Sequence, residues 1–349
     1  MKIVKSILIA CVLSITSLSV SAKVVSINGA GATFPYPVYA KWAEEYHKET
    51  GVQINYQAIG SGGGIRQITA NTVDFGASDK PLSQEELKKD GMIQFPAVMG
   101  AIVPIVNIPN IKAGELKLDG KTLAEIYLGQ IKKWNDPRLV KLNPTLKLPD
   151  RPIYVVHRSD GSGTTYNFTD YLSRVSPQWK ATVGRNTDIA WPQKATTIGG
   201  NGNAGVANFV SRTPGTIGYV EYAFAKQNDL AYTQLTSADG HFLKPSMKTF
   251  QAAAANADWA HAPDFHLLLN NQPGADSWPM TAATFILLHK KQADPKKAKA
   301  IVDFFDWGYK HGAGYATGLD YIPMPASVVK LVENVWKKDL TSDGKTIIK

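Results

Sequence analysis

The hydrophobic and polar positions of this 349-residue chain change their periodicity repeatedly. Tyr39, Trp42 and Tyr46 have the spacing of an amphipathic helix, which we expect Gly51 to end. In the next segment, residues 52–58, apolar and polar positions alternate as in a half-buried strand. Because helical and strand patterns continue to alternate along the chain, the sequence predicts an α/β fold of mostly parallel sheets flanked by helices.

Two later segments, residues 101–108 and 283–289, are strongly apolar and predict buried strands. The length favours about two domains, and we find no internal repeat or low-complexity linker between them. The chain should therefore pass between two lobes on these strands. We expect one lobe to comprise residues 23–103 plus 281–349 and the other to comprise residues 104–280.

Local signals also indicate where helices begin. Ser83 with Glu86, and Thr122 with Glu125, fit the capping box, in which a hydroxyl and a carboxylate satisfy N–H groups at a helix N-terminus. Another helix is expected to begin near Ile65, after a glycine-rich loop. These starts place helices between the predicted strands.

Residues 1–22 have the composition of a signal peptide. Two lysines precede the mostly apolar segment 7–20, and small residues follow up to Ala22, after which we expect cleavage. The mature protein should therefore be exported to the periplasm and soluble. Cleavage would also remove Cys11, the single cysteine of the sequence, which excludes a disulfide framework and a thiolate nucleophile.

The formal net charge of the whole chain is +9 at pH 7. Nucleic-acid binding would favour basic residues interleaved with aromatic ones, and the sequence does not show that pattern. We interpret the excess of lysine as solvated helix faces. The seven histidines form no metal-binding motif, and no catalytic triad can be singled out. We therefore expect no metal, no cofactor and no catalytic residue.

Three segments rich in glycine and hydroxyl residues precede helical patterns: residues 29–35, 59–65 and 158–165. Such segments present backbone N–H groups and short O–H donors to an anion at a helix N-terminus. The third follows a predicted strand, residues 153–156, and leads into a predicted helix, residues 164–174. Each segment alone is also consistent with an ordinary turn, but together they predict a site for a small tetrahedral anion.

Asp79 indicates which anions the predicted site would accept. Taken alone, it is consistent with an exposed turn residue ahead of Pro81. Beside an anion site, its carboxylate would repel a fully ionised ligand such as sulfate. It would accept a hydrogen bond from an anion that still carries a proton, such as hydrogen phosphate.

Two further motifs have simpler interpretations. Residues 200–205 match G-x-G-x-x-G, but the preceding segment is a poor strand, so we interpret them as a glycine-rich turn that begins the helix of residues 206–211. His157, next to Arg158, should point to the opposite face of its strand and have a surface or packing role.

The whole mature chain resembles the periplasmic phosphate-binding proteins of the high-affinity Pst-type phosphate ABC transporter. The resemblance is carried by the three glycine-rich segments and by residues 70–79, 118–123, 131–134, 217–222 and 304–307. It implies a two-lobed periplasmic-binding-protein fold, type II-like, that closes on its ligand in the interlobe cleft. It also implies a monomer that is not an enzyme, binds inorganic phosphate and delivers it to transmembrane permease subunits.

The resemblance further implies a set of direct phosphate contacts: Thr33, Phe34, Ser61, Asp79, Arg158, Ser162, Gly163 and Thr164. Asp79 would accept the proton of the ligand, and Arg158 would supply the formal positive charge. Asp160 would pair with Arg158 and hold its guanidinium group in place. The other residues would donate through backbone N–H groups and hydroxyls.

The sequence departs from the closest relatives at Ala58, Gly62 and His157, where we would expect Gly, Ser and Arg. None of these is an implied ligand contact. Two alternatives follow from the residues alone: an exported phosphatase, which would need a nucleophile or a metal cluster, and a receptor for sulfate, molybdate or another oxyanion, which Asp79 disfavours.

Overall fold

The computed structural model describes residues 26–192 and 196–348. Within these residues, the main feature is an 11-stranded sheet with the order β2-β1-β3-β13-β4-β8-β6-β7, to which β9, β12 and β14 add short pairings. Its strands are β1 (Ser26–Gly31), β2 (Gln53–Ala58), β3 (Phe75–Ser78), β4 (Met92–Val106), β6 (Tyr154–Arg158), β7 (Thr197–Gly200), β8 (Thr216–Glu221), β9 (Ala231–Tyr232), β12 (Leu269–Asn270), β13 (Met280–His289) and β14 (Ile322–Pro323).

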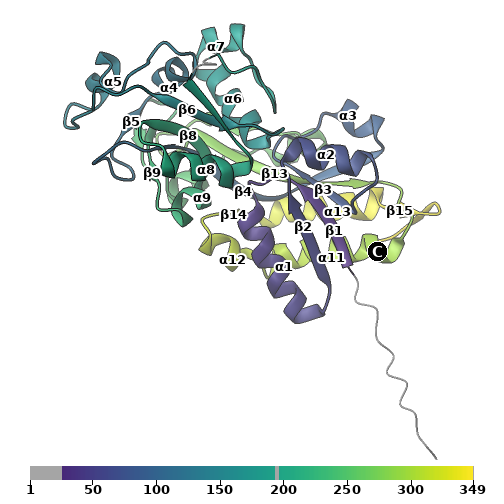
Figure 1. The fold of residues 1–349 in the computed structure, drawn as a ribbon. Helices are drawn as coiled ribbons and strands as arrows, with labels where there is room; N and C mark the ends of the chain where they lie inside the picture. Colours follow the sequence, from purple (N-terminus) through teal and green to yellow (C-terminus); the bar gives the residue numbers. More distant parts are fainter. Residues whose placement is uncertain (1–25, 193–195, 349) are drawn as a thin grey trace, which may run out of the picture.

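Helices cover this sheet in two groups, which define two lobes (Figure 1). Lobe I contains β1, β2 and β3, and lobe II contains β6, β7 and β8. The helices of lobe I are α1 (Tyr36–Thr50), α2 (Ser61–Thr69), α3 (Gln84–Lys89), α11 (Pro295–Lys310), α12 (Ala313–Gly318) and α13 (Ala326–Asp339). Those of lobe II are α4 (Gly120–Tyr127), α5 (Pro137–Leu142), α6 (Gly163–Val175), α7 (Pro177–Thr182), α8 (Gly202–Arg212) and α9 (Tyr222–Gln227).

Smaller elements complete the fold. A three-stranded sheet and a two-stranded hairpin lie apart from the main sheet. They consist of β5 (Lys117–Leu118), β10 (Gln234–Thr236) and β11 (Phe242–Leu243), and of β15 (Thr341–Ser342) and β16 (Lys345–Thr346). The described residues also include α10 (Met247–Ala254) and the 3₁₀ turns η2 (Trp259–His261) and η3 (Pro263–Phe265).

The main sheet is mixed rather than mostly parallel. Within lobe I, β1 pairs in parallel with β2 and β3, and within lobe II, β6 pairs in parallel with β7 and β8. Between the lobes, β13 and β4 run antiparallel to each other and to their outer neighbours β3 and β8. The prediction of parallel sheets therefore holds inside each lobe and is wrong for the strands that join them.

These joining strands are the two apolar segments singled out in the sequence. All fifteen residues of β4 are buried, and β4 starts nine residues before the predicted segment 101–108. β4 pairs with β13 in one half and with β8 in the other, for example Ala101 with Thr281 and Ile102 with Glu221. A strand buried on both faces carries no polar alternation, which explains its continuous apolar sequence.

Each lobe has an aromatic core. In lobe I, the ring of Phe305 packs edge-on against Phe75 and Phe95, with centroids 5.3 and 5.7 Å apart. In lobe II, Phe168 stacks on Tyr219 at 4.1 Å. Burying one such side chain contributes about 1.5–3 kcal/mol. Packing of this kind fixes the helices that carry the functional residues.

Two helix ends agree with the sequence prediction. Gly51 ends α1 with a left-handed φ of 72°, and its N–H donates to His47 O. Ser83 caps α3: its hydroxyl accepts from Glu86 N, and the Glu86 carboxylate accepts from Ser83 N at 2.7 Å. The capping box therefore forms as predicted.

Two other helix starts were predicted wrongly. Asp119, rather than Thr122, caps α4, because its carboxylate accepts from Thr122 N at 2.7 Å. α2 begins at Ser61, four residues before Ile65, because Gly60 makes the turn with φ 85° and the following glycines are already helical.

No helix in the described part of the chain is long and apolar enough to cross a bilayer. The predicted signal segment, residues 1–22 with Cys11, lies outside the described residues.

Candidate functional site

The three glycine-rich segments meet where the two lobes touch. Thr33 and Phe34 lie between β1 and α1, Ser61 begins α2 directly after β2, and Gly163 begins α6 after β6. The carboxyl ends of parallel strands lie at one edge of a sheet, so each lobe turns its helix N-termini toward the other. The N–H of Gly62 in lobe I donates to Gly161 O in lobe II at 2.8 Å.

Two glycines permit this close approach. A Cβ on Gly163 would lie 2.4 Å from Ser61 Oγ and 2.6 Å from Asp79 Cβ, across the junction. A Cβ on Gly60, whose φ is 85°, would lie 2.2 Å from the Asp160 carboxylate. Larger residues at either position would push the lobes apart.

Arg158 and Asp160 form the predicted pair. Nε of Arg158 donates to Oδ1 of Asp160 at 2.7 Å, and Nη2 donates to Oδ2 at 2.5 Å, while the N–H of Gly202 also donates to Oδ1. Burial opposes ionisation of Asp160, but the hydrogen bonds and charge of Arg158 outweigh it and lower the pKa of Asp160. The guanidinium group is thus held in one orientation with its charge largely balanced.

Two serine hydroxyls at the site accept hydrogen bonds from the protein. Ser61 Oγ accepts from Asp79 N at 3.1 Å, and Ser162 Oγ caps α6 by accepting from Thr165 N at 3.0 Å. Both serines are fully buried. Because each oxygen accepts from an N–H, its own hydrogen points elsewhere and can donate to a further group.

The hydroxyls of Thr33 and Thr164 also accept hydrogen bonds, in their case from Asn203, the second residue of α8. Asn203 Nδ2 lies 2.8 Å from Thr33 Oγ1 and 3.2 Å from Thr164 Oγ1. Sequence reasoning missed this asparagine because the 200–205 motif was interpreted as a turn; it does begin a helix, but at Gly202 rather than 206.

Backbone donors complete the junction. Among the predicted contacts, the N–H groups of five residues have no acceptor within the described part of the chain: Thr33, Phe34, Ser61, Gly163 and Thr164. The first N–H groups of a helix have no partner inside that helix, and they carry its positive dipole end. The junction therefore combines backbone donors, hydroxyls and one guanidinium group.

Asp79 brings an acceptor into this set of donors. It follows β3 and is 1% exposed, and its Oδ1 is buried with no partner in the described chain. Its backbone is fixed on both sides, because its N–H donates to Ser61 and its carbonyl accepts from Asn167 Nδ2 at 2.7 Å. A buried acceptor without a donor costs about 1–3 kcal/mol, so this oxygen is poised for a proton-bearing ligand.

The surroundings of Asp79 also raise its pKa to about 7. Burial is the main cause, the hydroxyl of Thr284 and the charge of Arg158 act in the opposite direction, and the charge of Asp160 adds to the rise. The carboxyl thus titrates near neutral pH rather than near pH 4.

Phe34 is held by a tyrosine that the sequence did not point to. Tyr321 Oη lies 2.6 Å from Phe34 O and 2.7 Å from Glu221 Oε2, and all three residues are buried. The Tyr321 hydroxyl thus has two acceptors within reach, and Glu221 Oε2 also accepts from Ala223 N at 2.9 Å. Burial raises the pKa of Glu221 well above its ordinary value, while the hydrogen bond from Tyr321 acts in the opposite direction.

His157 has the predicted packing role. Its ring stacks on Trp191 with centroids 4.8 Å apart, and Nδ1 lies 2.8 Å from Arg158 O. Burial lowers the pKa of His157. The neighbouring imidazole is thus neutral at physiological pH and adds no charge beside Arg158.

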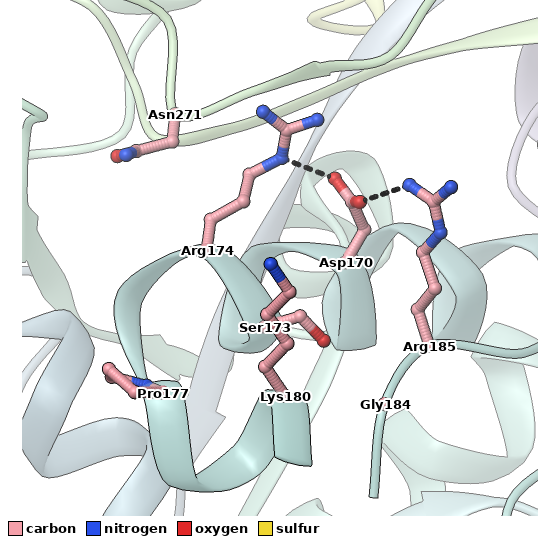
Figure 2. Close-up of a pocket in the computed structure, with 8 residues that line it drawn as sticks. All are labelled: Asp170, Ser173, Arg174, Pro177, Lys180, Gly184, Arg185 and Asn271. Atoms are coloured by element: carbon pink, nitrogen blue, oxygen red, sulfur yellow. Dashed lines mark hydrogen bonds and ion pairs between the residues drawn. The ribbon is translucent and has the colours of Figure 1, made fainter.

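A hollow of about 790 Å³ lies farther along α6 (Figure 2). There the Asp170 carboxylate accepts from Arg174 Nε and Arg185 Nη1, each at 2.7 Å, and from Asn270 Nδ2 at 3.0 Å. Figure 2 shows the two arginines on either side of Asp170, with Lys180 nearby. Because Asp170 bonds to all three side chains, this cluster holds α6 against β12 and the loop after α7.

All nine residues predicted from the sequence therefore lie at the lobe junction. In the described part of the chain, no group of three or more His, Cys, Asp or Glu residues is arranged to hold a metal ion.

Comparisons with known proteins agree with this arrangement. A model of the PBP superfamily domain matches residues 18–310. The chain is 53% identical to the phosphate-binding protein PstS of Pasteurella multocida over 344 residues, 98% of each chain, and 55% identical to PstS of Haemophilus influenzae over 319 residues, 91% and 95% of the two chains.

Its fold is also similar to a solved structure from Clostridium perfringens, a putative phosphate ABC transporter substrate-binding protein with bound phosphate. The TM-score is 0.62 at 17% identity, over 86% of this chain and all of that one. On the strength of the family model and the sequence identities, the chain belongs to the PBP superfamily and, within it, to the PstS family of phosphate-binding proteins.

Proposed function

We propose that this protein binds inorganic phosphate, as hydrogen phosphate, between its two lobes and delivers it to an ABC-type importer. The names of its relatives and the phosphate in the Clostridium perfringens structure support this reading. The direct contacts would be Thr33, Phe34, Ser61, Asp79, Arg158, Ser162, Gly163 and Thr164. Asp160 would hold Arg158 in place.

One observation carries the proposal: a buried carboxyl oxygen without a partner, Asp79 Oδ1, among groups that can only donate or are oriented to donate. Phosphate oxygens would accept from the N–H groups, the hydroxyls and Arg158. The ligand's one remaining O–H would donate a hydrogen bond to Asp79. Sulfate carries no proton near neutral pH and would leave Asp79 opposed to a negative oxygen, which is how the site would reject it.

The binding cycle would follow from the two-lobed fold. Boundaries after residues 103 and 280 fall inside β4 and β13, so lobe I (residues 23–103 plus 281–349) and lobe II (104–280) would hinge on these strands. Export with cleavage after about Ala22 would place the protein in the periplasm, as a monomer that meets transmembrane permease subunits. The protein would bind and release phosphate unchanged.

Calorimetric titration of refolded, phosphate-free protein tests the proposal. We expect tight one-to-one binding of phosphate and none of sulfate near pH 8. Asp79→Asn should then bind sulfate as well, since an amide can both donate and accept. Asp74→Asn is the matched control, because Asp74 lies at the opposite end of β3 and pairs with Lys297.

The contrary outcomes are distinct. Absence of oxyanion binding by the wild-type protein would refute phosphate binding, and unchanged sulfate exclusion in Asp79→Asn would refute the role of Asp79. Turnover of a phosphomonoester would instead indicate a phosphatase.

A further inference from the structure

We propose that Asn203 is a positioning residue for the ligand. It orients the hydroxyl hydrogens of Thr33 and Thr164 toward the bound anion, and it makes that orientation depend on contact between the lobes. The inference rests on the proposed function, because it concerns how the same site acquires its donors.

The orientation of the Asn203 amide follows from its partners. Its Oδ1 accepts from Glu221 N at 2.9 Å, and a backbone N–H can only donate, so the oxygen must face Glu221. Nδ2 then faces the two threonines, at 2.8 Å from Thr33 Oγ1 and 3.2 Å from Thr164 Oγ1. Asn203 is completely buried, so water does not compete for these bonds.

The two hydroxyls thereby become donors. Thr33 Oγ1 accepts from both Asn203 N, at 3.1 Å, and Nδ2, which uses both of its lone pairs. Thr164 Oγ1 accepts from Asn203 Nδ2 and, at 3.4 Å, from Arg158 Nη1. Each oxygen has one hydrogen left, and that hydrogen cannot point at an N–H. Both hydroxyls are thus preset to donate, which favours an anion whose facing oxygens carry no proton.

The same bonds join the lobes. Thr33 belongs to lobe I, whereas Asn203 and Thr164 belong to lobe II. Gly202, with φ 65°, allows the approach, because even a Cβ there would come within 3.2 Å of Thr33 Cγ2. When the lobes separate, Thr33 loses both N–H partners and its hydroxyl is free to rotate. Asn203 therefore links donor orientation to closure and should slow release of the ligand.

Three variants test this role: Asn203→Ala, Asn203→Asp and Asn143→Ala as the matched control. Asn143 is also a buried asparagine and bonds to Lys117 and Leu139, all within lobe II and away from the junction. Inorganic phosphate is titrated by calorimetry, its release is followed by stopped-flow fluorescence, and the unfolding midpoint is recorded for each variant.

We expect Asn203→Ala to weaken phosphate binding about tenfold, mainly through faster release. Asn203→Asp should weaken it by at least about 100-fold, because a carboxylate accepts from both hydroxyls, turns their hydrogens away from the ligand and adds a negative charge. Asn143→Ala should lower the unfolding midpoint and leave affinity unchanged.

A double-mutant cycle with Thr33→Val isolates the positioning effect. If Asn203 acts through Thr33, the second substitution should add little to the first. Affinities within twofold of wild type in both Asn203 variants, or fully additive losses with Thr33→Val, would overturn the inference while phosphate binding stands. Failure of the wild-type protein to bind phosphate would instead overturn the proposed function. Asn203→Asp preserves shape, so its result decides the case even if Asn203→Ala does not fold.

Discussion

Two buried aspartates have contrasting surroundings: Asp79 lies beside the N-terminus of α6, and Asp170 lies within that helix. Near its N-terminus, Asp79 lies among donors, yet its Oδ1 has no partner, and its pKa is raised to about 7. Farther along, Asp170 is 3% exposed and is shared by Arg174, Arg185 and Asn270. Both carboxyls are buried, but one is satisfied by the protein and the other is not.

The difference separates a structural carboxylate from one that waits for a ligand. Burying a carboxylate is costly unless hydrogen bonds and opposite charges compensate, and Asp170 has both. Asp79 is compensated only in part, by a distant Arg158 and by hydroxyls, so the folded protein retains an unfavourable contribution there. A ligand that donates a hydrogen bond to Asp79 would remove this unfavourable contribution. Its removal would then add to the binding free energy of the ligand.

The largest effect is expected when a satisfied carboxylate at the site loses its partner. Arg158→Met would remove the positive charge and leave Asp160 partly buried and unpaired. Removing a buried charged donor that faces the anion costs roughly 2–5 kcal/mol of binding free energy, so phosphate affinity should fall by about 1000-fold. Calorimetry measures the affinity. The control is Arg138→Met, because Arg138 is an exposed arginine that also forms an ion pair. A loss of less than tenfold would contradict the role given to Arg158.

Asp79→Asn should change selectivity more than affinity. An amide keeps an acceptor for the ligand's proton and gains a donor for an unprotonated oxygen. We expect the preference for phosphate over sulfate to fall by about 100-fold or more, since an unpaired buried group costs 1–3 kcal/mol or more. Competition between the two anions gives the ratio directly. An unchanged ratio would place the selectivity elsewhere.

The raised pKa of Asp79 predicts two pH effects of moderate size. Sulfate rejection should be strongest above pH 7 and should weaken as pH falls through about 7, because the protonated carboxyl can donate to sulfate. A pKa raised above the unfolded value contributes stability that is present at low pH and is lost as pH rises through the folded pKa.

The ligand-free protein should accordingly lose stability between about pH 4 and pH 7 through this group, and Asp79→Asn should lose less over the same range. Thermal unfolding of phosphate-free samples at several pH values measures this. Identical pH profiles for the two proteins would show that folding leaves the pKa of Asp79 unchanged.

The smallest effect on phosphate binding is expected when Asp170 is substituted. Asp170→Asn would weaken both arginine contacts and cost about 1–3 kcal/mol of stability, because Arg174 and Arg185 are partly exposed and can be solvated. Phosphate affinity should change by no more than about threefold. Denaturant unfolding and titration of the same sample separate the two effects. A large loss of affinity with normal stability would mean that the surroundings of Asp170 are coupled to the N-terminus of α6.

Much of this site could be predicted from the sequence, because its contacts lie in three local motifs. Glycines, hydroxyl residues and some helix starts are read from neighbouring positions, whereas the pairing of Arg158 with Asp160 was implied by the resemblance to the family. Asn203 and Tyr321 were missed because their partners are distant in sequence and an isolated Asn or Tyr carries no local signal.

The errors in the fold have a similar cause. The antiparallel direction of β4 and β13 depends on how distant strands pair, and apolar segments buried on both faces have the same pattern in either direction. α2 begins at Ser61 because tertiary contacts hold three successive glycines in a helix, against their intrinsic preference.

The pairing of β3 with β13 also sets the timing of folding. Ser78 pairs with Phe285, so β3 lacks one of its two neighbours until most of the chain has been made. The N-terminal strands cannot complete their sheet early, and contacts between such distant positions form slowly. A sheet that is completed only by one of its last strands stays open at β3 for most of the time in which the chain is made.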